Sequence, residues 1–161
     1  MSEQRIGLGV DLHRVASGDD EQGRPLVLGG YVFPGEPGLI GHSDADVVAH
    51  AIADGILGAA GLGDLGMHFP DADERWRGAD SLAILRRCVE LAGAEGWRVV
   101  NGDCTVVCER PKVAPARASM IELLSAAVGG PVHVKATRPE GLGSLGRVEG
   151  IACLAVVLLE R

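Results

Sequence analysis

The sequence predicts an α/β protein, a two-layer sandwich in which a mixed β-sheet carries its helices on one face. Segments rich in Val, Ile and Leu alternate with longer segments of helical period, in the order ββ-αα-β-α-ββ. The last strand, "IACLAVVLL", is apolar on both faces, as in a strand with no solvated side. A sheet covered on one side only leaves an apolar face, which self-association can bury.

The individual elements follow from alternation, helical spacing and turn residues. Strands are expected at 5–13, 25–33, 97–109, 132–137 and 151–160. The first helix is expected at 42–61, with Ser43 as its N-cap and Asp46 completing a capping box. Further helices are expected at 79–95 and 114–128. The Gly-rich segments 63–78 and 138–150 are interpreted as loops, and long loops in compact domains are usually functional.

Length and composition fit a single domain over residues 1–161, with 47% hydrophobic and 23% charged residues. A net charge of −7 argues against broad binding of nucleic acid or membrane surfaces, but a small phosphorylated ligand stays compatible with it. The chain has no apolar stretch of the ~18 residues that a membrane span needs. Its start lacks the features of a signal peptide, so a cytoplasmic location is expected. The four cysteines form no CxxC pair and are expected to be buried thiols.

Two groups of polar residues point to a metal site. Asp11 and His13 alternate on one face of the first strand, and His50 lies on the first helix between Asp46 and Asp54, each one turn away. One Asp and two His would leave the fourth position of a catalytic zinc ion open, with Asp46 and Asp54 as outer hydrogen-bond acceptors. The alternative is a capped helix with a solvated acidic face. Spacing alone does not show that strand and helix pack together.

Anion-binding features occur elsewhere. His42 stands just before the expected N-cap, where it could bind an anion with the first backbone N–H groups of the helix, or simply be an exposed loop residue. The loop after 132–137 combines Thr137, Glu140 and Arg147 with glycines and could cradle phosphate, with Glu140 free for a hard cation such as Mg²⁺. An ordinary loop between strands is the alternative. Asp64, Asp71 and Asp73 could hold hydroxyls or a cation, but surface turns are the simpler interpretation.

Taken together, these segments resemble the 2-C-methyl-D-erythritol 2,4-cyclodiphosphate synthase family of the non-mevalonate isoprenoid pathway. The resemblance covers nearly the whole chain. It rests on "GLGVDLHR", "GHSDADVVAHAIADGILGAAGLGDLGMHFPDADERWRGADS", "ERPK", "VKAT" and "RVEGIA". The long middle stretch is the most specific of these.

The resemblance implies a homotrimer with active sites between subunits. It implies a divalent ion, usually zinc, at Asp11, His13 and His50, and Mg²⁺ or Mn²⁺ with the diphosphate at Thr137 and Glu140. The implied catalytic residues are His42, Thr137 and Arg138. The implied substrate contacts are made by Asp11, His13, His42, Ser43, Asp64, Gly66, Phe69, Asp71, Asp73, Pro111, Lys112, Thr137, Glu140 and Arg147.

The implied reaction converts 4-diphosphocytidyl-2-C-methyl-D-erythritol 2-phosphate to the 2,4-cyclodiphosphate and releases CMP. The 2-phosphate attacks the β-phosphorus of the same molecule, so no protein nucleophile is needed. The chain accordingly shows no Ser-His-Asp or Cys-His signature. The bound cations would offset the repulsion between two negatively charged groups, and the enzyme would fold the substrate into a ring-like pose.

The sequence departs from the family pattern at two places. Arg138 stands where the family usually has a second Thr after "KAT"; Arg can donate to phosphate more strongly, but with a different reach. Ser144 and Leu145 stand where an aromatic residue often lies beside a central trimer cavity that can hold isoprenoid diphosphates.

Two other functions share the same residues. A zinc phosphohydrolase would aim a metal-bound water at phosphorus and release inorganic phosphate or a linear monophosphate. A non-catalytic trimeric binding protein would close a structural metal site with a fourth protein ligand.

Overall fold

A four-stranded sheet and three longer helices dominate the structure, a computed structural model that describes residues 2–17, 24–70 and 72–161. The strands are β1 (Gln4–Arg14), β2 (Pro25–Leu28), β3 (Tyr31–Pro37), β4 (Arg98–Val107), β5 (Val132–Thr137) and β6 (Gly150–Glu160). The helices are α1 (Val47–Ala60), α2 (Leu65–His68), α3 (Ser81–Ala94), α4 (Arg117–Val128) and α5 (Gly143–Gly146), with 3₁₀ turns at Glu74–Trp76 and Ala114–Ala116.

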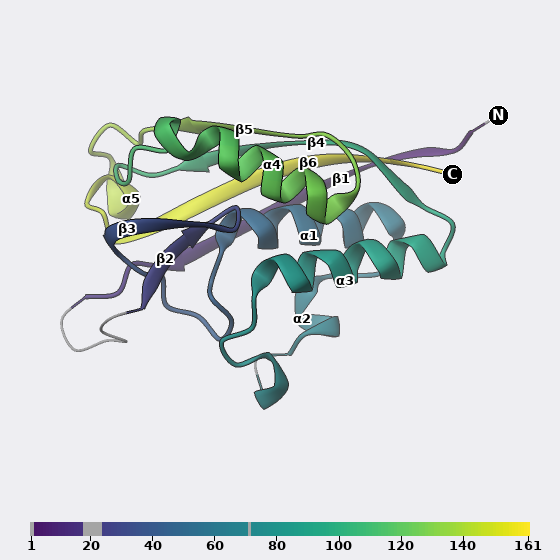
Figure 1. Cartoon of the computed structure of the whole chain (residues 1–161), viewed down its shortest axis with the longest axis horizontal. Helices are drawn as coiled ribbons and strands as arrows, with labels where there is room; N and C mark the ends of the chain where they lie inside the picture. The colour runs from purple at the N-terminus through teal and green to yellow at the C-terminus, as the bar shows by residue number, and fades with distance from the viewer. Residues whose placement is uncertain (1, 18–23, 71) are drawn as a thin grey trace.

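The main sheet is mixed, as predicted. Its strand order is β1-β6-β4-β5, in which β6 runs antiparallel to both neighbours while β4 and β5 are parallel. Helix α1 packs on β1 and β6, α4 packs on β5, and α3 lies against α1 and α4 (Figure 1). The fold class is therefore α/β. None of the helices in the described ranges is both long and apolar enough to cross a bilayer.

The segment 25–33, predicted as one strand, is two strands of a separate hairpin. Leu28 pairs with Tyr31, and Gly29 and Gly30 between them have φ values of 57° and 77°. A two-residue hairpin loop with positive φ at both positions is the setting in which a Gly-Gly pair is favoured. The turn was not predicted because apolar residues flank it on both sides, so that the segment resembles one continuous strand.

The first helix begins at Val47, so the prediction of a start near residue 42 with Ser43 as N-cap was wrong. Asp46 is the N-cap, and its buried carboxylate accepts hydrogen bonds from the backbone N–H groups of Val48 and Ala49. The same carboxylate accepts hydrogen bonds from the N–H groups of Gly29 and Gly30 at 2.8 and 2.7 Å. Asp46 thus joins the hairpin to α1, which no local capping pattern encodes.

The contact between β1 and α1 is a close approach of two backbones. A Cβ atom added at Gly9 would lie 1.8 Å from the carbonyl oxygen of Ala51, and one added at Gly7 would lie 1.8 Å from that of Gly55. Only a residue without a side chain fits at either strand position. The two glycines therefore set the distance between the strand and the helix that carry Asp11, His13 and His50.

We expect Gly9→Ala to lower the free energy of unfolding by at least about 2 kcal/mol, because the new methyl group meets backbone that has no room to move. Gly58→Ala on α1 is the matched control, since a Cβ there meets nothing within 4 Å. It should be neutral or stabilise the protein by up to about 1 kcal/mol, the usual helix preference of Ala over Gly. Urea unfolding of both variants gives the comparison, and equal stability of the two would contradict the close approach.

Candidate active site

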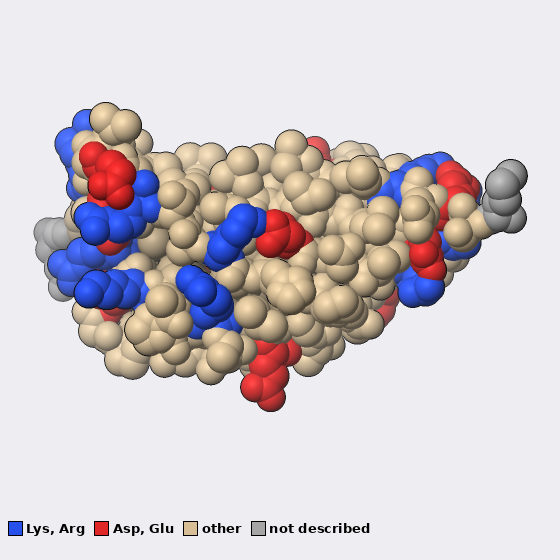
Figure 2. Space-filling view, turned by 90° about the horizontal axis from the view of Figure 1, so that it is seen from above, with Lys and Arg blue, Asp and Glu red and all other residues tan. Residues whose placement is uncertain are grey.

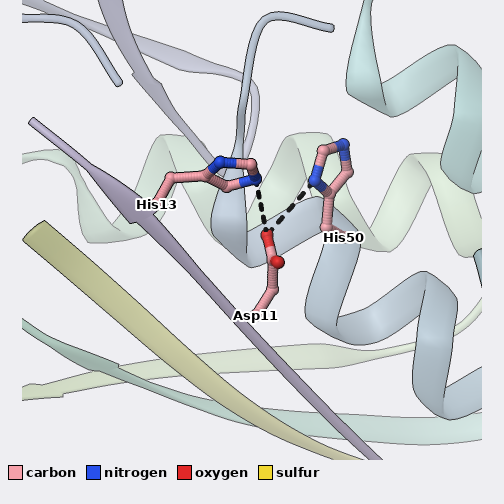
Figure 3. A group of neighbouring side chains, drawn as sticks. All are labelled: Asp11, His13 and His50. Atoms are coloured by element: carbon pink, nitrogen blue, oxygen red, sulfur yellow. Dashed lines mark hydrogen bonds and ion pairs between the residues drawn. The ribbon is translucent and has the colours of Figure 1, made fainter. Parts of the chain in front are cut away.

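The strand–helix contact brings Asp11, His13 and His50 together (Figure 3). Asp11 and His13 lie on one face near the end of β1, and His50 lies in the first turn of α1. The Oδ2 atom of Asp11 is 3.2 Å from Nε2 of His13 and 3.2 Å from Nδ1 of His50. A metal ion needs several such side chains close together, and among the described residues these three form the group that meets this condition. The three residues come together as predicted.

The outer nitrogen of each imidazole is committed as a hydrogen-bond donor. Nδ1 of His13 lies 2.8 Å from the carbonyl oxygen of Ile40, which can only accept. Nε2 of His50 lies 2.9 Å from Oγ of Ser81, whose own hydroxyl donates to the carboxylate of Asp44. Both rings therefore turn their lone-pair nitrogens toward Asp11. Three electron-pair donors converge on one point, an arrangement that fits a divalent metal ion.

Without a metal ion, protonated imidazoles can donate to Asp11 in its place, and the pKa shifts of the three groups reflect that pairing. Burial alone would raise the pKa of Asp11, but hydrogen bonding and charge interaction with His13 and His50 hold that pKa well below its usual range. Burial would lower the pKa of His13, but its contact with Asp11 raises it above the usual value. Asp11 is therefore a carboxylate at neutral pH, ready to share a cation with the two imidazoles.

Asp46 and Asp54, predicted as outer acceptors for His50, do not play that part. Asp46 is committed to α1 and the hairpin, as described above. Asp54 accepts a hydrogen bond from the backbone N–H of Leu65 at 3.2 Å and so fixes the start of α2. The acceptor beside His50 is Ser81, from another helix.

The cluster lies at the polar end of a cavity of about 280 Å³. His42, Ser43 and Gly66, all predicted to bind substrate, line the same cavity. The large apolar side chains of its lining, called the apolar wall below, are Leu65, Phe69, Trp76 and Ile84. Phe69 packs edge-on against Trp76 with ring centroids 4.8 Å apart. A mixed polar and apolar cavity of this size suits a small phosphorylated molecule with a carbon skeleton.

The polar residues around this cavity are already hydrogen bonded. Nε2 of His42 lies 3.0 Å from the carbonyl oxygen of Asp73. Oγ of Ser43 accepts from the backbone N–H of Ala45 and lies 3.2 Å from Nε2 of His50. Because α1 starts at Val47, the prediction that His42 stands just before the N-cap was wrong, and binding of an anion by His42 stays a prediction.

The aspartates of the following loop lie at turns. Asp64 caps α2 by accepting from the N–H of Met67, and Asp73 accepts from Arg75 in an exposed ion pair. Neither borders the first cavity. Asp71 lies outside the described residues.

A second cavity of about 310 Å³ lies between the end of β5 and the segment that follows β4. Its lining includes the predicted residues Pro111, Lys112, Thr137 and Arg138. Glu109 also borders it, and its carboxylate accepts from Nε of Arg138 at 3.0 Å and from the N–H of Gly141 at 2.6 Å. Since the two cavities share no lining residue, one chain keeps the predicted site residues in two separate groups.

The remaining predicted residues are exposed on the loop after β5. Glu140 has a φ of 52° and is not part of the Asp11 cluster. Arg147 pairs with Glu149 at 2.6 Å. Ser144 and Leu145 form the middle of α5.

Sequence reasoning missed the residues behind the cluster and the apolar wall. Asp44 and Ser81 are far apart in the chain, and only the packing of α3 beside α1 brings them to His50. Trp76 and Ile84 carried an apolar signal alone, which does not separate cavity wall from core.

Fold and cluster together define a class: an α/β protein in which one carboxylate and two imidazoles, placed to hold a metal ion, line a cavity. Comparison with known proteins makes this more specific. Residues 4–160 match the model of the YgbB family. The chain therefore belongs to the YgbB family, and its relatives include many 2-C-methyl-D-erythritol 2,4-cyclodiphosphate synthases.

The synthase of Rubrobacter xylanophilus is 54% identical over 164 residues, which cover 100% of this chain and 98% of the relative. That of Geobacillus kaustophilus is 51% identical over 161 residues, 98% of each chain. Among solved structures, a synthase in a CDP-bound form has a TM-score of 0.84 at 38% identity and covers 96% of this chain and 99% of its own. The bifunctional IspDF of Campylobacter jejuni reaches a TM-score of 0.92 at 36% identity, covering 99% of this chain and 43% of its own. The resemblance drawn from the sequence is confirmed.

We expect the metal-free protein to bind one divalent ion at the cluster, measured with Co²⁺ through its visible absorption. His13→Ala removes one of three ligands and should weaken Co²⁺ binding by more than about 100-fold, beyond the usual effect of losing an outer partner. His133→Ala, an exposed histidine of β5, is the control and should bind like the parent protein. Equal Co²⁺ affinity in all three proteins would place the metal elsewhere.

Proposed function

We propose that this chain converts 4-diphosphocytidyl-2-C-methyl-D-erythritol 2-phosphate to 2-C-methyl-D-erythritol 2,4-cyclodiphosphate and CMP. It is a phosphorus–oxygen lyase of the non-mevalonate isoprenoid pathway. The observation that carries the proposal is the Asp11–His13–His50 cluster at the head of a cavity, in a chain that matches cyclodiphosphate synthases along its whole length. A single domain over residues 1–161 and a cytoplasmic location stay predictions.

The first cavity is proposed to hold the methylerythritol phosphate part of the substrate. Asp11, His13 and His50 would hold Zn²⁺, which supplies Lewis acidity and positive charge at the β-phosphate. The proposed substrate contacts that line this cavity are His42, Ser43, Gly66 and Phe69. Asp64, Asp71 and Asp73 stay predicted substrate contacts. The apolar wall supports this assignment, because it can exclude water from the reacting phosphorus.

The second cavity is proposed to hold the cytidine and diphosphate. Pro111 and Lys112 would lie along the nucleoside, and Thr137 would donate to the diphosphate. Glu140 would bind Mg²⁺ or Mn²⁺ with the substrate, and Arg147 would contact its anionic part. The ion pair with Glu109 supports a role for Arg138, because it restrains a guanidinium that borders this cavity.

A homotrimer would join the two kinds of cavity, each site taking the metal half from one subunit and the nucleotide half from its neighbour. The uncovered face of the main sheet supports self-association. Its exposed apolar side chains are Ile6, Leu8, Val10 and Leu12 of β1 and Leu154 and Val156 of β6. Figure 2 views the molecule from above and shows charged side chains gathered mainly toward its two ends, with a largely uncharged middle. An apolar face of this kind is usually covered by another protein surface.

In the proposed reaction, the protein forms no covalent bond with the substrate. An oxygen of the 2-phosphate forms a bond to the β-phosphorus of the same molecule, and the bond from that phosphorus to the CMP oxygen breaks. The leaving CMP takes the electron pair, so no water and no protein nucleophile enters the balance. His42 and Ser43 line the cavity and would orient the phosphate, and such positioning can supply several kcal/mol of the barrier reduction.

The direct test is incubation of zinc-loaded protein with the cytidyl substrate and Mg²⁺, followed by phosphorus NMR. We expect the cyclic diphosphate and CMP in equal amounts, and a loss of rate of at least about 100-fold in His50→Ala because the loss of a ligand removes the ion's charge stabilisation. Inorganic phosphate or a linear monophosphate would instead identify a phosphohydrolase. Intact substrate with a bound metal ion would identify a non-catalytic binding protein.

A further inference from the structure

Behind His50, two side chains form a hydrogen-bonded pair that the proposed reaction does not use. Ser81 is the first residue of α3 and is completely buried. Its hydroxyl donates to Oδ1 of Asp44, and its backbone N–H donates to Oδ2 of the same carboxylate at 3.1 Å. Asp44 therefore holds Ser81 by both its hydroxyl and its backbone.

This arrangement decides the state of the imidazole. Because the Ser81 proton is given to Asp44, Oγ of Ser81 faces Nε2 of His50, 2.9 Å away, as an acceptor. His50 must then carry a proton on Nε2 and keep the lone pair of Nδ1 for the cluster. The hydroxyl of Ser43, 3.2 Å from the same nitrogen, is a longer second acceptor.

The two imidazoles of the cluster differ in the acceptor of their outer hydrogen bond. His13 donates to a neutral backbone carbonyl, that of Ile40. His50 donates to a hydroxyl that is itself polarised by a carboxylate. A carboxylate behind a metal-binding histidine raises the basicity of the ligating nitrogen.

We propose that Asp44 and Ser81 are positioning residues of the metal centre, which fix His50 with Nδ1 toward the ion and strengthen its hold on that ion. The proposal rests on the proposed zinc site. It also links the metal to the cavity wall. The backbone N–H of Asp44 donates to the carbonyl of Ala79 at 3.0 Å, and the N–H of Ala79 donates to the carbonyl of Trp76 at 3.1 Å. The segment that orients His50 is thus continuous with the segment that carries the apolar wall.

The test measures Zn²⁺ affinity of metal-free protein by competition with a chromophoric chelator, alongside urea unfolding of the same metal-free samples. We expect Ser81→Ala to weaken Zn²⁺ binding by about 10-fold and Asp44→Asn by about 10- to 100-fold, the range seen when partners behind metal ligands are removed. Asp80→Asn is the matched control, because Asp80 precedes Ser81 and caps α3 from the solvent side. It should leave the Zn²⁺ affinity within about twofold of the parent.

Coupling separates this role from a structural one. In the double variant, the loss of Zn²⁺ affinity should be clearly smaller than the product of the two single losses, because both changes interrupt one chain of hydrogen bonds. Asp44 and Ser81 also hold each other in the metal-free protein, so coupling in its unfolding is expected in either case, and only coupling in the Zn²⁺ affinity supports the proposal.

A measurement on the parent protein covers the case in which a variant does not fold. In the zinc-loaded parent, the Nε2–H proton of His50 should give an NMR signal that exchanges slowly with solvent, because its acceptor is buried. A fast-exchanging proton would overturn the proposal, as would variants that lose stability but keep the parent's Zn²⁺ affinity. A parent protein that binds no Zn²⁺ would overturn the metal site itself, which distinguishes that failure from this one.

Discussion

Backbone-to-backbone packing of β1 on α1 is the contact on which the site depends. Gly7 and Gly9 leave no side chain between strand and helix, and the carbonyl groups of Gly55 and Ala51 fill the space that a Cβ would need. The same strand then presents Asp11 and His13 on the face that meets α1. With wider spacing, the carboxylate and the two imidazoles would not share one point. The absence of side chains at Gly7 and Gly9 is therefore a condition for assembling the Asp11–His13–His50 cluster.

The outer nitrogens of both imidazoles have hydrogen-bond partners, whereas the atoms that face the centre of the cluster are placed to bind a cation. Outer hydrogen bonds to Ile40 and Ser81 turn both imidazole lone pairs inward, where Asp11 also points. Proteins rarely leave such donors of electron pairs unpaired. A divalent ion bound there would accept these electron pairs and have one coordination position left for a substrate oxygen. A three-ligand centre beside a cavity therefore suits phosphoryl transfer better than a structural role.

Local sequence patterns predicted the residues of the cluster and the family. The features that they did not predict depend on contacts between residues far apart in the chain. The alternation in "GVDLHR" and the helical position of His50 predicted the Asp11–His13–His50 cluster, and the motifs of the middle segment predicted the family; the clustering and the family are confirmed. The Gly29–Gly30 turn was hidden in an apolar run. Ser43 fits a capping pattern, yet the cap is Asp46, because that carboxylate also serves the hairpin. Ser81 reaches His50 only through the packing of α3, to which no spacing rule applies.

In the proposed homotrimer, each chain carries two half-sites that are completed between neighbours. The most direct measurement is co-expression of two differently tagged chains, one with His50→Ala and one with Thr137→Ala and Arg138→Ala, each inactive alone. Each mixed trimer, whichever chain it contains twice, pairs two intact halves in one of its three sites, so purified mixed trimers should recover about a third of the parent's CMP release. Mixed trimers, verified by mass spectrometry, that stay inactive would contradict the claim, because they would show that every site is built within one chain.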